Sequence, residues 1–189
     1  VYYARAYDAQ RQHVQADKVY AARMDGKQGA WAGFDGIVTA IDRGQWEQAR
    51  RANQVELEKA IAGRNLTEEL AARAGELELA ALSTDPDMGV KLQQEIRWHR
   101  ANADAIRAIY PPSADEYALV IGIAAAIVGN AEVVQAMLLQ VKDSPLLAEY
   151  PMAAQQYQVL LAEQDRLQGR PDAAILRLQP IIARDDALL

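Results

Sequence analysis

Glycine, proline and aspartate interrupt the chain at short intervals and divide it into segments of helical length. A glycine after the last apolar residue commonly ends a helix, and a proline suits the first turn of the next one. No segment shows the sustained alternation of apolar and polar residues that is typical of a strand. Alanine and leucine, both strong helix formers, dominate the apolar residues. The sequence therefore predicts an all-α fold in a single domain.

The interruptions predict about nine helices joined by short turns. The first, residues 1–24, is a lone N-terminal helix whose Tyr3, Tyr7 and Tyr20 can lie along one side. We expect this side to pack on the second helix or, as we favour, on a missing neighbouring repeat. The other eight helices form four antiparallel pairs, which span residues 30–62, 66–110, 113–142 and 151–187.

Polar side chains and one proline indicate how several of these helices begin and end. Asn65 or Thr67 can cap the fourth helix, because each can accept a hydrogen bond from a free amide of the first turn. Ser113 can cap the sixth helix in the same way. Pro180 lies inside the ninth helix, and it should kink or end that helix because it removes a backbone donor.

The most apolar stretch, residues 118–129, reads ALVIGIAAAIVG. Twelve helical residues rise only about 18 Å, whereas the hydrocarbon layer of a bilayer is about 30 Å thick. We therefore interpret this stretch as a buried helix in the middle of the fold and expect no insertion into a membrane.

Three expected turns share a glycine that is followed five residues later by a small or β-branched residue. The pairs are Gly44 and Ala49, Gly129 and Val134, and Gly169 and Ala174. The glycine permits the left-handed backbone that reverses the chain, and the small residue lets the second helix approach the first. Gly122 and Ala162, each seven residues before a turn glycine, supply a small residue midway along the first helix.

This pattern resembles the tetratricopeptide repeat family over residues 30–187, most clearly in the last two pairs. The resemblance implies a right-handed superhelix of antiparallel helix pairs, an α-solenoid. The family repeats near 34 residues, whereas Gly129 and Gly169 are 40 residues apart. We place the six additional residues in a loop at 143–150.

The resemblance also implies a binding surface, because the first helix of each pair lines the inner wall of such a superhelix. That wall is expected to bind an extended peptide or a partner helix. The residues that we expect to face inward are Phe34, Val38, Glu116, Ile123, Gln156, Glu163 and Arg166.

Residues that could perform chemistry are few and scattered. The absence of cysteine excludes disulfides, thiolate nucleophiles and zinc sites built on sulfur. His13 and His99 lie on different helices without a second ligand nearby, and we interpret Glu95 and His99 as a solvent-facing helical pair. The acidic clusters lie at helix ends, and no nucleophile elbow or phosphate-binding motif is present. We expect no enzyme activity, no metal and no cofactor.

The charge and the aromatic residues bear on possible partners. Lys and Arg number 20 against 26 Asp and Glu, a formal net charge of −6, which disfavours a nucleic-acid partner. Trp31, Phe34 and Trp46 around the first pair can form an outward patch, although an interhelical core is the more common role. Trp98 is expected to be half-buried.

We therefore expect a protein-interaction scaffold, such as the interaction or sensory portion of a larger bacterial-type regulator or assembly protein. The alternatives are a homo-oligomerisation domain, with a possible homodimer, and a helical receptor for a small ligand. The chain starts with valine, so we interpret it as a piece of a longer protein, which can be soluble in the cytoplasm or the periplasm.

Overall fold

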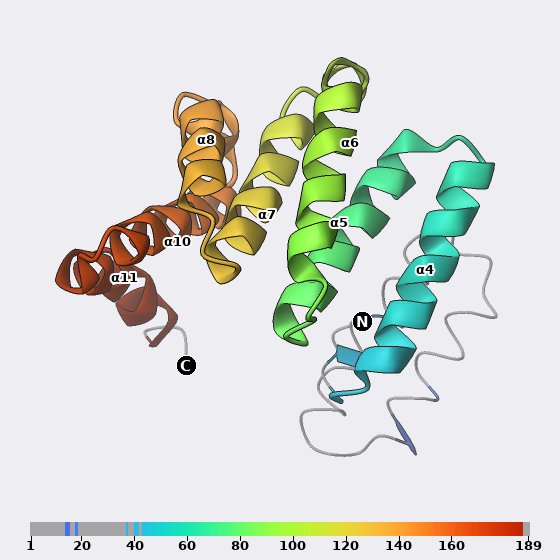
Figure 1. Ribbon diagram of the computed structural model, residues 1–189, viewed down its shortest axis with the longest axis horizontal. Helices are drawn as coiled ribbons and strands as arrows, with labels where there is room; N and C mark the ends of the chain where they lie inside the picture. Colours follow the sequence, from blue (N-terminus) through green and yellow to red (C-terminus); the bar gives the residue numbers. More distant parts are fainter. Residues whose placement is uncertain (1–13, 16–17, 19–36, 38–39, 42, 187–189) are drawn as a thin grey trace. The chain divides into compact units, whose positions relative to one another are not determined.

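The computed structural model describes residues 14–15, 18, 37, 40–41 and 43–186 (Figure 1). Most of the expected helix 1–24 lies outside these residues, as do His13, Trp31, Phe34 and Val38. Within them the chain is helical and has no strand, which confirms the all-α prediction. The eight helices with determined bounds are α4 (Trp46–Ala62), α5 (Leu66–Leu82), α6 (Met88–Ile109), α7 (Ser113–Ile127), α8 (Ala131–Val141), α9 (Leu146–Glu149), α10 (Pro151–Leu167) and α11 (Pro171–Asp186).

The helix ends confirm one local prediction, the Asn65 cap, and correct others. Ser113 is the first residue of α7 and does not cap it, because Pro112 occupies the capping position without a side-chain hydrogen bond. Asn65 caps α5, since its Oδ1 accepts a hydrogen bond from the amide of Glu68 at 3.3 Å. Pro180 does not end α11, which continues to Asp186. The expected loop at 143–150 contains the short helix α9.

Five turns between helices have the same backbone geometry. Their left-handed residues are Gly44, Arg64, Thr84, Gly129 and Gly169, with φ between 52° and 75°. In each turn, the amide of this residue donates to the carbonyl three residues earlier at 2.9–3.4 Å. The next amide donates to the carbonyl five residues earlier at 2.8–3.0 Å. This is the Schellman ending of a helix, and it confirms the left-handed glycines that the sequence predicts.

The carbonyl that accepts the longer-range bond belongs to a buried residue at every turn. That residue is alanine at four turns and aspartate at the last: Ala40, Ala60, Ala80, Ala125 and Asp165. The small residues predicted after the turn glycines, Ala49, Val134 and Ala174, are buried as well. Short side chains on both sides of a turn let consecutive helices pack closely.

The chain divides into two compact units, Val1–Leu79 and Ala80–Leu189. In the first unit, Ile37, Ala40, Ala49 and Leu79 form a buried cluster, and Trp46 packs against it. Trp46 is therefore an interhelical core residue. The buried amide of Asn53 on α4 donates from Nδ2 to the carbonyl of Ala72 on α5 at 2.9 Å.

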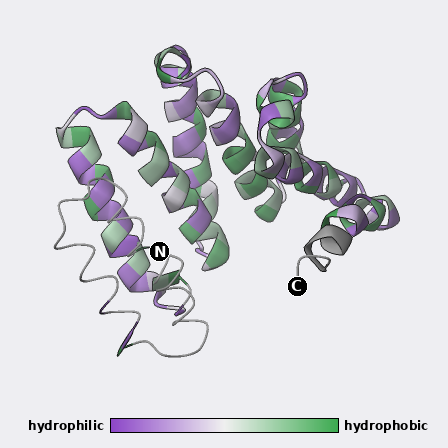
Figure 2. Ribbon diagram, turned by 180° about the vertical axis from the view of Figure 1, so that it is seen from behind, coloured by the Kyte–Doolittle hydropathy of each residue, from purple (hydrophilic) through white to green (hydrophobic). Residues whose placement is uncertain are grey.

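In the second unit, α7 is the central helix, since α6, α8 and α10 all contact it. It is the most apolar of the described helices, as its colour in Figure 2 shows. Most of its residues are buried. This confirms the interpretation of residues 118–129 as a core helix. No described helix is both long enough and apolar enough to span a bilayer. Helix α10 also contacts α8, α9 and α11.

At Gly122, helix α7 approaches its neighbours closely. A Cβ atom at this position would lie 2.5 Å and 3.1 Å from the two Cδ atoms of Leu160 on α10, and 3.3 Å from Cβ of Met137 on α8. Leu160 is fully buried, so its side chain has little room to move away. The small residue predicted midway along the first helix is therefore required by packing.

We expect the substitution Gly122→Ala to destabilise the protein by about 1–3 kcal/mol. The free-energy cost of displacing Leu160 should exceed the gain in helix propensity from alanine. Chemical denaturation of the full chain would measure the change. Gly89→Ala is the matched control, because a Cβ at this helical glycine meets nothing within 4 Å. It should leave the free energy of unfolding unchanged or raise it by up to about 1 kcal/mol. Equal stability of the two variants would contradict the packing argument.

Candidate functional site

The predicted binding residues within the described part of the chain lie on two helices that contact each other. Glu116 and Ile123 are on α7, and Gln156, Glu163 and Arg166 are on α10. Glu116 and Arg166 are exposed, and the other three are half-buried. The structure therefore places these five residues on neighbouring helices of the second unit.

The start of α7 and the start of α10 carry a sequence repeat that extends beyond the turn glycines. Each copy has Tyr-Pro, then alanine four residues and tyrosine seven residues after the first tyrosine. The copies are Tyr110-Pro111, Ala114 and Tyr117, and Tyr150-Pro151, Ala154 and Tyr157, at a spacing of 40 residues. The sequence analysis did not identify Tyr110 or Tyr150 as candidate site residues, although this spacing reveals both.

The two Tyr-Pro steps bring Tyr110 and Tyr150 together. Both tyrosines have an extended backbone, with φ of −154° and −123°, because a following proline disfavours the helical conformation. Their hydroxyl groups are hydrogen-bonded to each other. This hydrogen bond, partial burial and the nearby acidic groups Glu149 and Glu116 raise the pKa of Tyr110 to about 12.

Arg166 connects the two helices that carry the predicted residues. Its Nε donates to Oε2 of Glu163 at 2.7 Å. Its Nη2 donates to the carbonyl of Ala126, in the last turn of α7, at 3.1 Å. Arg166 therefore holds α10 against the end of α7, while about half of its side chain stays exposed.

Asp165 is a buried acid that holds two arginines of the last hairpin. Its side chain is 4% exposed. Arg177 of α11 donates from Nε to Oδ2 at 2.6 Å, and Arg170 donates to Oδ1 from both Nε, at 3.1 Å, and Nη2. These hydrogen bonds, from Arg177 first and then from Arg170, lower the pKa of Asp165.

A second buried polar cluster lies between α6 and α7. Glu95 and His99 are both buried, so their interpretation as a solvent-facing pair is wrong. Tyr117 of α7 covers both, and its hydroxyl donates to Oε2 of Glu95 at 2.7 Å. Nε2 of His99 lies 3.2 Å from the carbonyl of Ala114. Trp98 is half-buried as expected and contacts the Tyr117 ring edge to face, with centroids 5.8 Å apart.

Burial lowers the pKa of His99, because the charged imidazolium loses its hydration inside the protein. The hydrogen bond with the Ala114 carbonyl opposes this shift and is the smaller effect. His99 is therefore held in its neutral form, and the cluster joins α6 to α7 through one hydroxyl, one imidazole and one carboxyl group.

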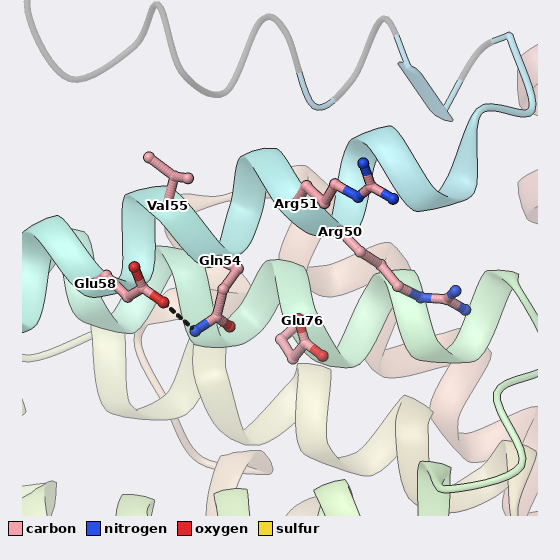
Figure 3. Close-up of a pocket in the computed structure, with 6 residues that line it drawn as sticks. All are labelled: Arg50, Arg51, Gln54, Val55, Glu58 and Glu76. Carbon is pink, nitrogen blue, oxygen red and sulfur yellow. Dashed lines mark hydrogen bonds between the residues drawn. The ribbon is translucent and has the colours of Figure 1, made fainter.

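The first unit has a hollow of about 390 Å³ along one face of α4. Figure 3 shows that Arg50 and Arg51 lie toward one end and Glu58 toward the other. Gln54 donates from Nε2 to Oε1 of Glu58 at 2.9 Å. Val55 of α4 and Glu76 of α5 complete the lining. Since five of the six residues come from a single helix, the hollow is a surface feature and encloses little space for a small ligand.

Two of the acidic clusters noted in the sequence lie at helix starts. Glu68 and Glu69 lie in the first turn of α5, and Oδ1 of Asp85 accepts the amide of Asp87 at 2.8 Å. Within the described part of the chain, no group of three or more acidic or histidine side chains is placed to hold a metal ion. Comparisons with protein-family models, curated proteins and solved structures found no match for this chain.

We expect the thermal stability of the protein to fall as the pH decreases from 7 to 5.5. In this range His99 of the unfolded chain, with a pKa of about 6.5, takes up a proton, whereas the buried His99 of the folded protein stays neutral. The extra proton bound by the unfolded state lowers the free energy of unfolding. The substitution His99→Gln should flatten this part of the profile measured by thermal denaturation. An unchanged pH dependence in the variant would contradict a buried neutral histidine.

A second acid transition should come from Asp165. Its lowered folded pKa stabilises the protein above the unfolded value of about 3.9, and this contribution is lost as the pH falls through the folded pKa. Asp165→Asn should therefore be less stable than the wild type at pH 7, with a smaller difference in strong acid. The effects of His99 and Asp165 on stability can be separated because they fall in different pH ranges.

Proposed function

We propose that the chain is a protein-interaction scaffold, a tetratricopeptide-like α-solenoid that binds an extended peptide or a partner helix on the surface of its first helices. The observation that carries the proposal is the packing of α10 on both helices of the preceding hairpin, α7 and α8. Consecutive helix pairs stack in this way in solenoid proteins, where each repeat contacts its neighbours.

The forty-residue register supports the proposed surface. It aligns Glu116 with Gln156 and Ile123 with Glu163, so the predicted residues occupy equivalent positions on two consecutive first helices. A right-handed superhelix would bring such positions onto its inner wall. Side chains that repeat along the wall suit a ligand that is itself extended.

The side chains of this surface also suit a peptide. Glu116 has an exposed carboxylate. Arg166 is exposed as well, and its guanidinium keeps N–H donors that are not used in the bonds to Glu163 and Ala126. Ile123 is half-buried and adds an apolar contact. A mixture of charged, amide and aliphatic groups can bind both the backbone and the side chains of a partner.

Self-association is the second candidate, and α11 favours it. Ile175 and Leu176 are 57% and 65% exposed on neighbouring positions of this helix. Exposed apolar residues of this size can pack against a second copy. Sedimentation would distinguish the candidates, since only self-association predicts a dimer whose fraction rises with protein concentration.

We expect the double substitution Glu163→Gln with Arg166→Gln to weaken binding of a peptide selected on the full chain by about tenfold or more, equivalent to 1.4 kcal/mol. Peptides would be selected from a random displayed library and measured by calorimetry. The melting temperature should fall by only a few degrees, because Arg166 donates one hydrogen bond to α7.

The matched control is Asp104→Asn with Arg107→Gln, which removes another exposed pair at i, i+3, on α6. The control should leave the affinity unchanged. Failure to select any peptide, or a peptide that binds the double variant as tightly as the wild type, would contradict the proposed surface. A large loss of stability in the double variant would show that these two residues serve the core instead.

A further inference from the structure

Two tyrosine rings meet at the end of the second unit where α7 and α10 begin. Tyr110 is 39% exposed and Tyr150 is 44% exposed. The hydrogen bond between their hydroxyl groups keeps the two side chains side by side. Each tyrosine precedes a proline at the same position of the forty-residue repeat. The repeat therefore places the two tyrosines at equivalent positions in consecutive hairpins.

Two carboxylates lie within electrostatic reach of these rings. Glu116 is in the first turn of α7, and Glu149 directly precedes Tyr150. The hydrogen bond with Tyr150 raises the pKa of Tyr110 most, and the negative charges of Glu149 and Glu116 raise it further. Both glutamates are exposed, and neither carboxylate has a hydrogen bond or ion pair within the described part of the chain.

Two exposed apolar residues are close in sequence to the two tyrosines. Ile109, next to Tyr110, is 50% exposed, and Met152, two residues after Tyr150, is 68% exposed. We call the set of Ile109, Tyr110, Glu116, Glu149, Tyr150 and Met152 the tyrosine–glutamate patch. Its surface combines aromatic rings, free carboxylates and aliphatic groups.

A cationic side chain complements each part of this patch. A guanidinium or ammonium group is attracted to the face of a tyrosine ring, by about 0.5–1 kcal/mol at an exposed site, and to a carboxylate. The methylene stem of arginine or lysine can cover apolar side chains such as Ile109 and Met152.

The charge of the whole unit favours the same kind of ligand. Residues 80–189 contain fourteen Asp and Glu against nine Lys and Arg, a formal net charge of −5. This unit therefore carries most of the net charge of the chain, and its field attracts a basic segment and repels an acidic one.

We propose that the tyrosine–glutamate patch binds an arginine or lysine side chain in a basic segment of a partner protein. The inference rests on the proposed scaffold function and gives the partner a chemical class. A second copy of this chain is a poor occupant, because its own acidic unit would be repelled by the same charges.

The test uses the full chain with isotope-labelled tyrosine rings and synthetic Gly-Ser peptides that carry two arginines, two lysines, two glutamates or no charge. The arginine and lysine peptides should shift the ring signals of Tyr110 and Tyr150 in a saturable way, and the other two peptides should not. Raising the salt concentration from 50 to 300 mM should weaken the binding, because exposed charges are screened.

Charge-removing variants then locate the binding. Glu116→Gln with Glu149→Gln should weaken the affinity for the arginine peptide about fivefold. Glu132→Gln with Asp172→Asn is the matched control, since both acids are exposed, lie in the first turns of α8 and α11 and change the net charge equally. This control should change the affinity by less than about twofold.

The aromatic contribution is tested with Tyr110→Phe and Tyr150→Phe, which keep the rings and should keep the binding, and with Tyr110→Ala and Tyr150→Ala, which should remove it. If the alanine variants do not fold, the glutamate variants still decide the question. Ring signals that ignore the cationic peptides, or a control pair that weakens binding as much as the patch pair, would overturn the proposal.

Failure of this inference can be told apart from failure of the scaffold function. If selected peptides bind the chain and retain their affinity when each arginine and lysine is replaced by glutamine, the patch has no cationic ligand while the scaffold proposal stands. If no peptide is selected and the arginine peptide still shifts the tyrosine rings, the scaffold proposal fails while the patch stands.

Discussion

The close contact between Gly122 of α7 and Leu160 of α10 determines how the second unit is arranged. Because glycine has no Cβ, Leu160 can fill the space against α7, and α10 then reaches α8 as well. The tyrosine pair and the Arg166 contact with the end of α7 both depend on this separation of the helices. A larger side chain at residue 122 would therefore disturb the proposed surface along with the core.

Much of the fold was predictable from the sequence, because turns leave local signals. Gly44, Gly129 and Gly169 mark left-handed positions that few other residues tolerate. Arg64 and Thr84 adopt the same backbone without such a signal, since the hydrogen bonds of the turn outweigh a local preference. Gly63 is the more obvious turn residue before Asn65, but its φ is −78° and Arg64 takes the left-handed position.

The candidate site was harder to predict, because its contacts join residues that are distant in sequence. A spacing of four between Glu95 and His99 suggests an exposed helical pair, and only the packing of Tyr117 over them shows that both are buried. The proximity of Tyr110 and Tyr150 requires two helices to stack in one register. The forty-residue repeat places both tyrosines in the same register. The turn glycines have the same spacing, but they lie 19 residues after the tyrosines and do not by themselves identify them.

The two hairpins of the second unit use one backbone plan with different side chains. Where the first has Ala125 and Ala126, both buried, the second has Asp165 and Arg166. Asp165 keeps the buried position because Arg170 and Arg177 neutralise it, and Arg166 reaches back to the carbonyl of its own counterpart, Ala126. A buried charge has a large desolvation cost, which the hydrogen-bonded arginines of the same hairpin offset. The repeat can therefore keep its packing while it exchanges alanines for charged groups, and on the proposed scaffold such exchanges would adapt the surface to a partner.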